Sequence, residues 1–118
     1  MKKIIVMMIL AASALGMKAA TTAPAFPGGE SALKSYLSEN MQYPENPKEL
    51  GIEGVVSVTF MVKADGSIGN IKIKSQIDPD LESEAIRLVK LMPKWTPADN
   101  DGVAVDEEVN LDINFSLE

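Results

Sequence analysis

The chain has 118 residues, 46% of them hydrophobic and only 5% aromatic, and a formal net charge of −6 at pH 7. It contains no histidine and no cysteine, which excludes thiolate and imidazole metal sites and the nucleophiles that depend on either group. The acidic charge argues against nucleic acid as a partner, because phosphates are bound by basic surfaces.

The first nineteen residues have the layout of a secretory signal peptide. A basic start, "MKK", is followed by the uncharged run Ile4–Met17 and then by small residues. As a helix, this run would span only about 21 Å, which is less than the ~30 Å hydrocarbon core of a bilayer. We therefore expect cleavage and a periplasmic protein, with a retained inner-membrane anchor as the alternative. Removal of residues 1–19 takes away three basic and no acidic residues, which leaves a net charge of −9.

The mature chain is predicted to be one domain, residues 30–118, after a short and mobile lead-in at residues 20–29. Apolar residues at helical spacing predict a first helix at Glu30–Met41, and the prolines of "YPENPKELGIEG" break it. Alternation of apolar and polar residues then predicts a strand at 56–63, a hairpin turn at Asp65-Gly66 and a second strand at 68–76.

A second helix is predicted at Asp78–Met92, with Asp78 as N-cap and Pro79 at the first helical position. After a "DNDG" turn, residues 109–117 alternate again and predict a third strand. A right-handed crossover through the second helix places the third strand beside the first. The fold class is therefore α+β, an α-β-β-α-β chain with a three-stranded antiparallel sheet of order 2-1-3 and both helices on one face.

Trp95, the only tryptophan, lies between two prolines where the second helix ends. Such a ring can be a binding platform or a plug at the end of the core. We favour the plug, because the prolines fix the chain so that the ring can pack over the apolar face.

Catalytic patterns are weak in this sequence. Asp99, Asp101, Gly102 and Glu108 match four positions of a calcium loop, but the first position would be Pro97, which has no side-chain ligand. We predict no enzyme activity, no metal or other cofactor and no small-molecule substrate.

The edges of the predicted sheet are better candidates for function. The second strand carries Lys72 and Lys74, which discourage stray pairing, whereas the third has no lysine or proline. An open edge there could accept an added peptide strand. The alternative is an edge covered by the C-terminus or by the partner in a homodimer. We expect one of Asn110 and Asn114 to direct its N–H outward and the other toward the first strand, and the sequence leaves open which is which.

Several segments together resemble the TonB C-terminal domain family. They are "QYP", "GIEGVVSVTFMVKADGSIGNIKI", "LESEAIRLVKLMPKW" and "VNLDINF", and "FPGGESALKSYL" is similar to the Bacteroidetes-type form of the domain. The resemblance covers about Phe26–Leu117. It implies two helices on a three-stranded antiparallel sheet, in agreement with the layout reached from the residue pattern.

The resemblance also implies a function. Domains of this family bind a short segment, the TonB box, of outer-membrane TonB-dependent transporters as an added strand beside their last strand. The residues that match the two contact regions of the family are Gln42, Tyr43, Pro44, Val109, Asn110, Leu111, Asp112, Ile113, Asn114 and Phe115.

This sequence departs from a full energy transducer, because its apolar segment is short and it has no long proline-rich arm before the domain. The expected function is a periplasmic TonB-like domain that binds extended peptides by strand addition. The alternative is a homodimeric or cell-wall-associated interaction module with no role in transport.

Overall fold

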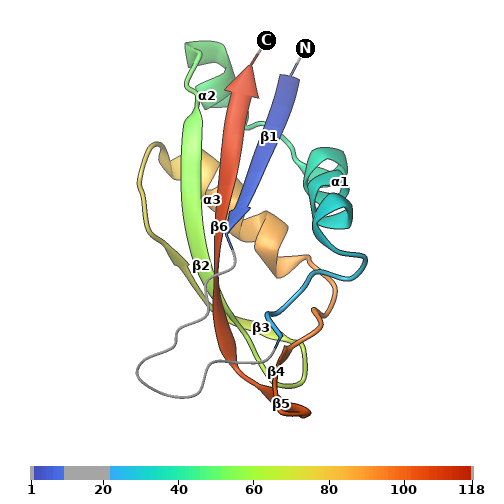
Figure 1. The fold of residues 1–118 in the computed structure, drawn as a ribbon. Helices are drawn as coiled ribbons and strands as arrows, with labels where there is room; N and C mark the ends of the chain where they lie inside the picture. The colour runs from blue at the N-terminus through green and yellow to red at the C-terminus, as the bar shows by residue number, and fades with distance from the viewer. Residues whose placement is uncertain (1, 10–21, 118) are drawn as a thin grey trace.

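The computed structural model describes residues 2–9 and 22–117. The main sheet is antiparallel and has four strands in the order β1-β6-β2-β3 (Figure 1). Its strands β2 (Gly54–Val62), β3 (Ile68–Ile73) and β6 (Glu107–Leu117) are the three predicted ones, with β2 between the other two, and β1 (Lys2–Ile9) is an additional strand beside β6. This arrangement confirms the predicted fold class and the strand order 2-1-3. The Asp65-Gly66 turn is confirmed as well, because it joins β2 to β3.

Helices α1 (Glu30–Asn40) and α3 (Pro79–Lys90) contribute their apolar stripes to one core on the same face of the sheet. The predicted cap of α3 is confirmed, since the Asp78 carboxylate accepts hydrogen bonds from the backbone N–H groups of Asp80 and Leu81 at 2.8 and 3.2 Å. The strands alternate as expected, with the buried residues Val56, Val58, Phe60, Val62, Val109, Leu111, Ile113 and Phe115 facing the helices.

A short helix, α2 (Glu45–Leu50), follows the first helix and is not among the two helices predicted from the sequence. Pro44 is its N-cap and Pro47 lies in its first turn, where a proline costs no intrahelical hydrogen bond. Gly51 ends it in the left-handed conformation. The two prolines therefore fit the start of α2 as well as separating it from α1.

Trp95 is the predicted core plug, with only 2% of its surface exposed. Its ring meets those of Phe26 and Phe60 edge to face, with centroid distances of 5.8 and 5.3 Å. The backbone of Trp95 also donates to the carbonyl of Gly66 at 2.9 Å. A Cβ at Gly66, where φ is +87°, would lie 2.4 Å from the Trp95 carbonyl oxygen. This turn therefore requires glycine both for its conformation and for the close approach.

The segment before α1 is paired with the chain that follows Trp95. Thr22 and Asp99 exchange two backbone hydrogen bonds of 3.0 and 3.1 Å, and Ala25 and Thr96 exchange two of 3.0 and 2.8 Å. Phe26 is in the core. The expectation of a mobile lead-in is therefore wrong for residues 22–26, which are tied to the domain.

The predicted "DNDG" turn is the tip of a small hairpin of β4 (Ala98–Asn100) and β5 (Val103–Val105). Asp101 and Gly102 take positive φ values of 54° and 85° at this tip. The hairpin extends past the end of the main sheet, below β3 and β6 in Figure 1. In the described part of the chain, no helix is both long and apolar enough to cross a bilayer.

Candidate functional site

Strand β6 pairs with β2 along the whole length of β2 and carries most of the predicted peptide-binding residues. Its odd-numbered residues from Val109 to Phe115 are fully buried against the helices. Its even-numbered residues from Asn110 to Ser116 lie half-buried on the opposite, polar face, where the Asp112 carboxylate accepts a hydrogen bond of 2.7 Å from the Ser57 hydroxyl. The side chains of this strand thus project from the two faces of the sheet. Its backbone N–H and C=O groups lie in the plane of the sheet and point toward the neighbouring strands.

The direction of each backbone group on β6 follows from its neighbour β2. The carbonyl of Ser57 accepts a hydrogen bond of 2.8 Å from the N–H of Lys74, and the N–H of Ser57 donates to Ser75 Oγ at 3.0 Å. Both backbone groups of Ser57 therefore point toward β3. Asp112, which lies opposite Ser57, must direct its own backbone groups away from β2, because antiparallel pairs alternate in this respect.

The register between β2 and β6 runs without a shift from the Gly54–Phe115 pair to the Val62–Glu107 pair. Every even-numbered residue of β6 therefore behaves as Asp112 does. Asn110 and Asn114 both direct their N–H and C=O groups to the outer edge. The expectation that only one of the two does so is wrong, because residues four apart on a strand have the same orientation.

The outer edge of β6 is paired in this structure of the full chain, whereas the sequence predicts an open edge for the chain without residues 1–19. Strand β1 (Lys2–Ile9) pairs with it in antiparallel orientation, from the Lys2–Leu117 pair to the Ile9–Asn110 pair (Figure 1). Within the described part of the chain, the segment that covers this edge is the N-terminal one. Ile and Val, which are frequent in this segment, suit an extended strand as well as an apolar helix. Residues 10–19 of the predicted signal peptide lie outside the described residues.

The second predicted contact region, Gln42–Pro44, lies between the C-terminal end of α1 and the start of α2. The ring of Tyr43 is buried and meets the ring of Phe115 edge to face at a centroid distance of 5.8 Å. Its hydroxyl donates to the carbonyl of Ile52, and burial raises the pKa of this phenol above its ordinary value. The structure thus brings the two predicted regions together. Tyr43 supports β6 from the core side, while Gln42 is exposed.

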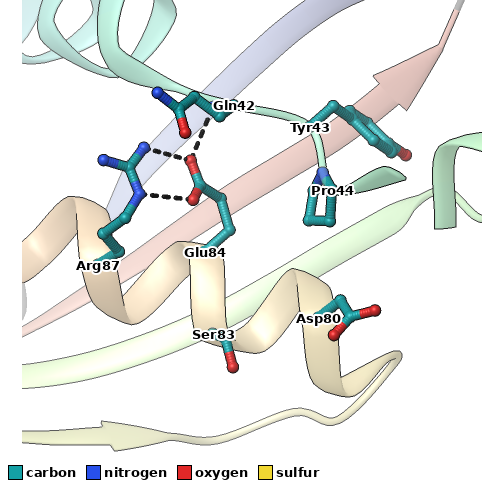
Figure 2. A pocket seen from close by; sticks show the side chains of 7 residues that line it. All are labelled: Gln42, Tyr43, Pro44, Asp80, Ser83, Glu84 and Arg87. Atoms are coloured by element: carbon teal, nitrogen blue, oxygen red, sulfur yellow. Dashed lines mark hydrogen bonds and ion pairs between the residues drawn. The ribbon is translucent and has the colours of Figure 1, made fainter. Parts of the chain in front are cut away.

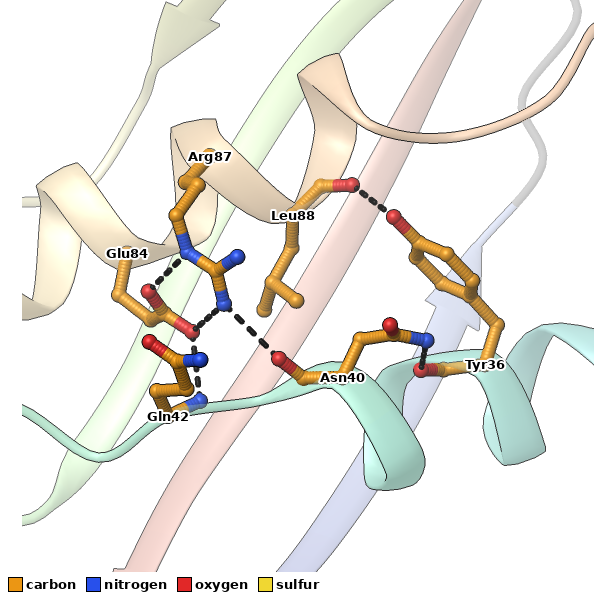
Figure 3. A network of polar contacts seen from close by, with 6 residues as sticks. All are labelled: Tyr36, Asn40, Gln42, Glu84, Arg87 and Leu88. Atoms are coloured by element: carbon orange, nitrogen blue, oxygen red, sulfur yellow. Dashed lines mark hydrogen bonds and ion pairs between the residues drawn. The ribbon is translucent and has the colours of Figure 1, made fainter.

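An ion pair on α3 positions this segment, as Figure 3 shows. The carboxylate of Glu84 is buried and accepts a hydrogen bond of 2.7 Å from the backbone N–H of Gln42. Arg87 donates to both oxygens of Glu84 at 2.7 Å, and a further hydrogen bond of 2.8 Å reaches the carbonyl of Asn40 at the end of α1. The hydrogen bonds to Glu84 raise the pKa of the Arg87 guanidinium.

Tyr36 adds a second tie between the same two helices, because its hydroxyl donates to the carbonyl of Leu88 at 2.7 Å. Burial raises the pKa of Tyr36 as well. The sequence analysis did not find this network. One feature could have indicated it: Glu84 lies three residues after Leu81 and four before Leu88, so a carboxylate occupies the apolar stripe of its helix.

A hollow of about 340 Å³ opens between this segment and α3 (Figure 2). It is lined by Gln42, Tyr43, Pro44, Asp80, Ser83, Glu84 and Arg87. Its charged groups are the carboxylates of Asp80 and Glu84 and the guanidinium of Arg87, which is paired with Glu84. Across residues 2–9 and 22–117, no cluster of three metal-ligating side chains occurs.

Comparison with known proteins gives a consistent result. Residues 39–117 match the family described as the C-terminal region of the Gram-negative bacterial TonB protein. Protein TonB of Helicobacter pylori strain J99 is 30% identical over 86 residues, a match that covers 72% of this chain and 29% of that protein. This chain therefore corresponds to less than a third of the relative's length.

A solved structure agrees with the match in sequence. The solution structure of the C-terminal domain of Helicobacter pylori TonB superimposes with a TM-score of 0.56 at 28% sequence identity. The superposition covers 78% of this chain and 87% of that domain. Fold and sequence therefore point to the same family.

Proposed function

The chain belongs to the family of Gram-negative TonB C-terminal domains, and from this premise we propose that it binds extended peptide segments by strand addition to the outer edge of β6. The segments would be those of outer-membrane transporters, and the process TonB-dependent transport. The observation that carries this proposal is the unbroken eight-residue pairing of β1 with β6. An extended segment already fits this edge with no bulge.

Backbone groups would supply most of the affinity. The N–H and C=O groups of Asn110, Asp112 and Asn114 point outward, where an added strand can pair with them. Each hydrogen bond contributes roughly 0.5–1.5 kcal/mol net, so a segment gains affinity with each pair of residues that it adds. Helix α1 also lies close to the strand that pairs with the outer edge of β6. A bound segment is therefore expected to carry apolar residues at alternate positions.

Gln42–Pro44 would act as the second contact region. Glu84 and Tyr43 hold its backbone close to the C-terminal half of β6, and the exposed side chain of Gln42 is free to meet a bound segment. Direct contact through Tyr43 is limited, since its ring is buried. We propose that Tyr43 supports the site and that Gln42 and Pro44 touch the ligand.

A periplasmic location is part of the same proposal. It depends on the predicted signal peptide, which mass spectrometry of periplasmic protein can test, because a mature N-terminus between Met17 and Thr22 is expected. Recovery of the intact chain from inner membranes would instead favour a retained anchor.

The binding proposal is tested by titrating the ¹⁵N-labelled chain from residue 20 onward with a TonB-box peptide from a transporter of the same organism. Amide shifts confined to Gln42–Tyr43 and Glu107–Leu117 are expected. Asn114→Pro deletes an outward N–H and should reduce affinity at least tenfold, whereas Asn114→Ala keeps that N–H and should bind almost normally. Absence of shifts at millimolar peptide, or a doubled hydrodynamic mass with β6 already paired, would contradict the proposal.

A further inference from the structure

The N-terminal segment of this chain occupies the same backbone edge at which a peptide would bind. Strand β1 pairs with Asn110–Leu117, a range that includes six of the seven β6 residues predicted from the sequence to bind peptide. Only one strand can use these outward groups at a time. We propose that Lys2–Ile9 is a blocking strand, which keeps the β6 edge closed in the unprocessed chain and opens it when it is removed or displaced.

Ladder geometry identifies which β1 residues close the edge. Asp112 directs its backbone groups outward and pairs with Met7, so Met7 directs its own groups inward to β6. Ile5 does the same opposite Asn114. The backbone groups of Val6, between them, point away from β6. The N–H of Met7 therefore takes part in closure and that of Val6 does not.

Charge favours the same pairing. Lys2 and Lys3 are at the start of β1, whereas the chain from residue 20 onward carries eight basic and seventeen acidic residues. At the Lys2 end of β1, the partner Leu117 donates its N–H to the carboxylate of Glu53. A basic segment is therefore placed next to an acidic domain, at the end of the sheet where a carboxylate is close to the β6 backbone.

The covalent link makes the block effective. Twelve residues separate Ile9 from Thr22, and a connection of this length gives a tethered segment an effective concentration on the order of millimolar. A free peptide binds only to the fraction of molecules whose edge is open, and its apparent affinity falls in proportion. Closure also keeps an unpaired strand edge, which is a template for aggregation, out of contact with other chains.

The test uses the full chain and two matched variants, Met7→Pro and Val6→Pro. Proline at Met7 removes an N–H that points to β6, whereas proline at Val6 removes one that points away. Trp95 fluorescence reports folding in all three proteins, since Trp95 lies in the core and is not part of β1. The probe is a synthetic peptide with the sequence of Lys2–Ile9, added in trans.

In the unmodified chain and in Val6→Pro, we expect slow hydrogen exchange at Asp112 and Asn114 and little binding of the peptide. In Met7→Pro, exchange at both amides should accelerate and the peptide should bind at least tenfold more tightly. Rapid exchange in the unmodified chain, or equal peptide affinity in all three proteins, would overturn the inference.

The inference concerns the same edge as the proposed function and rests on it only for its biological meaning. The two can fail separately. One result would support the blocking strand and refute the proposed function. In it, the amides of Asp112 and Asn114 exchange slowly in the unmodified chain and rapidly in Met7→Pro, but no TonB-box peptide binds to either protein.

Discussion

Replacement of Trp95 tests whether its ring is a structural plug. The ring is 2% exposed and makes edge-to-face contacts with Phe26 and Phe60. Truncation of a buried large aromatic to alanine costs roughly 3–5 kcal/mol, and a domain of this size is held by only about 5–15 kcal/mol. We therefore expect Trp95→Ala to lower the melting temperature by roughly 15–30 °C.

Trp95→Phe provides the matched control. Among the described residues, the indole N–H of Trp95 is buried without an acceptor, so phenylalanine removes an unpaired polar group, worth about 1–3 kcal/mol, while it leaves a smaller cavity. The net loss should be near 1–2 kcal/mol, clearly below that of Trp95→Ala. Urea unfolding followed by far-ultraviolet circular dichroism is the suitable assay, because both variants lack the only tryptophan. An unchanged unfolding midpoint in Trp95→Ala together with lost peptide binding would show that the ring is a binding platform.

Two further predictions concern charged groups. Glu84→Gln should cost about 1–3 kcal/mol in urea unfolding, since it weakens hydrogen bonds to Arg87 and to the Gln42 N–H. The loss of unfolding free energy stays below that for a fully buried pair, because the Arg87 side chain is 36% exposed and can rehydrate. Absence of coupling between Glu84→Gln and Arg87→Met in a double-mutant cycle would refute this account. Hydrogen bonds from the hydroxyl and backbone N–H of Ser67 lower the pKa of Asp65, so Asp65 contributes stability above its unfolded pKa that is lost as the pH falls through the folded value. Urea midpoints measured from about pH 6 to about pH 3 should therefore fall less steeply in Asp65→Asn than in the unmodified chain, and identical slopes would contradict the assignment.

The sheet and the two long helices could be predicted because their evidence is local. Alternation in Val56–Val62 and Val109–Leu117 and the apolar stripe of α3 each follow from residues close together in the sequence. The position of Trp95 also followed from neighbouring prolines. For these elements, the short-range sequence pattern and the tertiary packing favour the same structure.

The missed features depend on contacts between distant segments. Thr22 pairs with Asp99, Glu84 with the backbone of Gln42, and β1 with β6. Each joins segments that are more than forty residues apart in sequence, and no pattern within either segment specifies the partner. The candidate site was therefore placed on β6 by resemblance, while the pairing of its edge by β1 could be seen only in the fold.

The pairing of Thr22 and Ala25 with the chain after Trp95 has a mechanical consequence. A pull on the backbone ahead of Thr22 reaches the Thr22–Asp99 and Ala25–Thr96 hydrogen bonds first, and then the buried ring of Phe26. Tension from that direction enters the molecule at the side of Trp95. The hydrogen bonds between β2 and β6 would carry load only after the Thr22–Asp99 and Ala25–Thr96 hydrogen bonds had broken. A peptide bound to β6 and a force applied through residue 22 would therefore act on different parts of the domain.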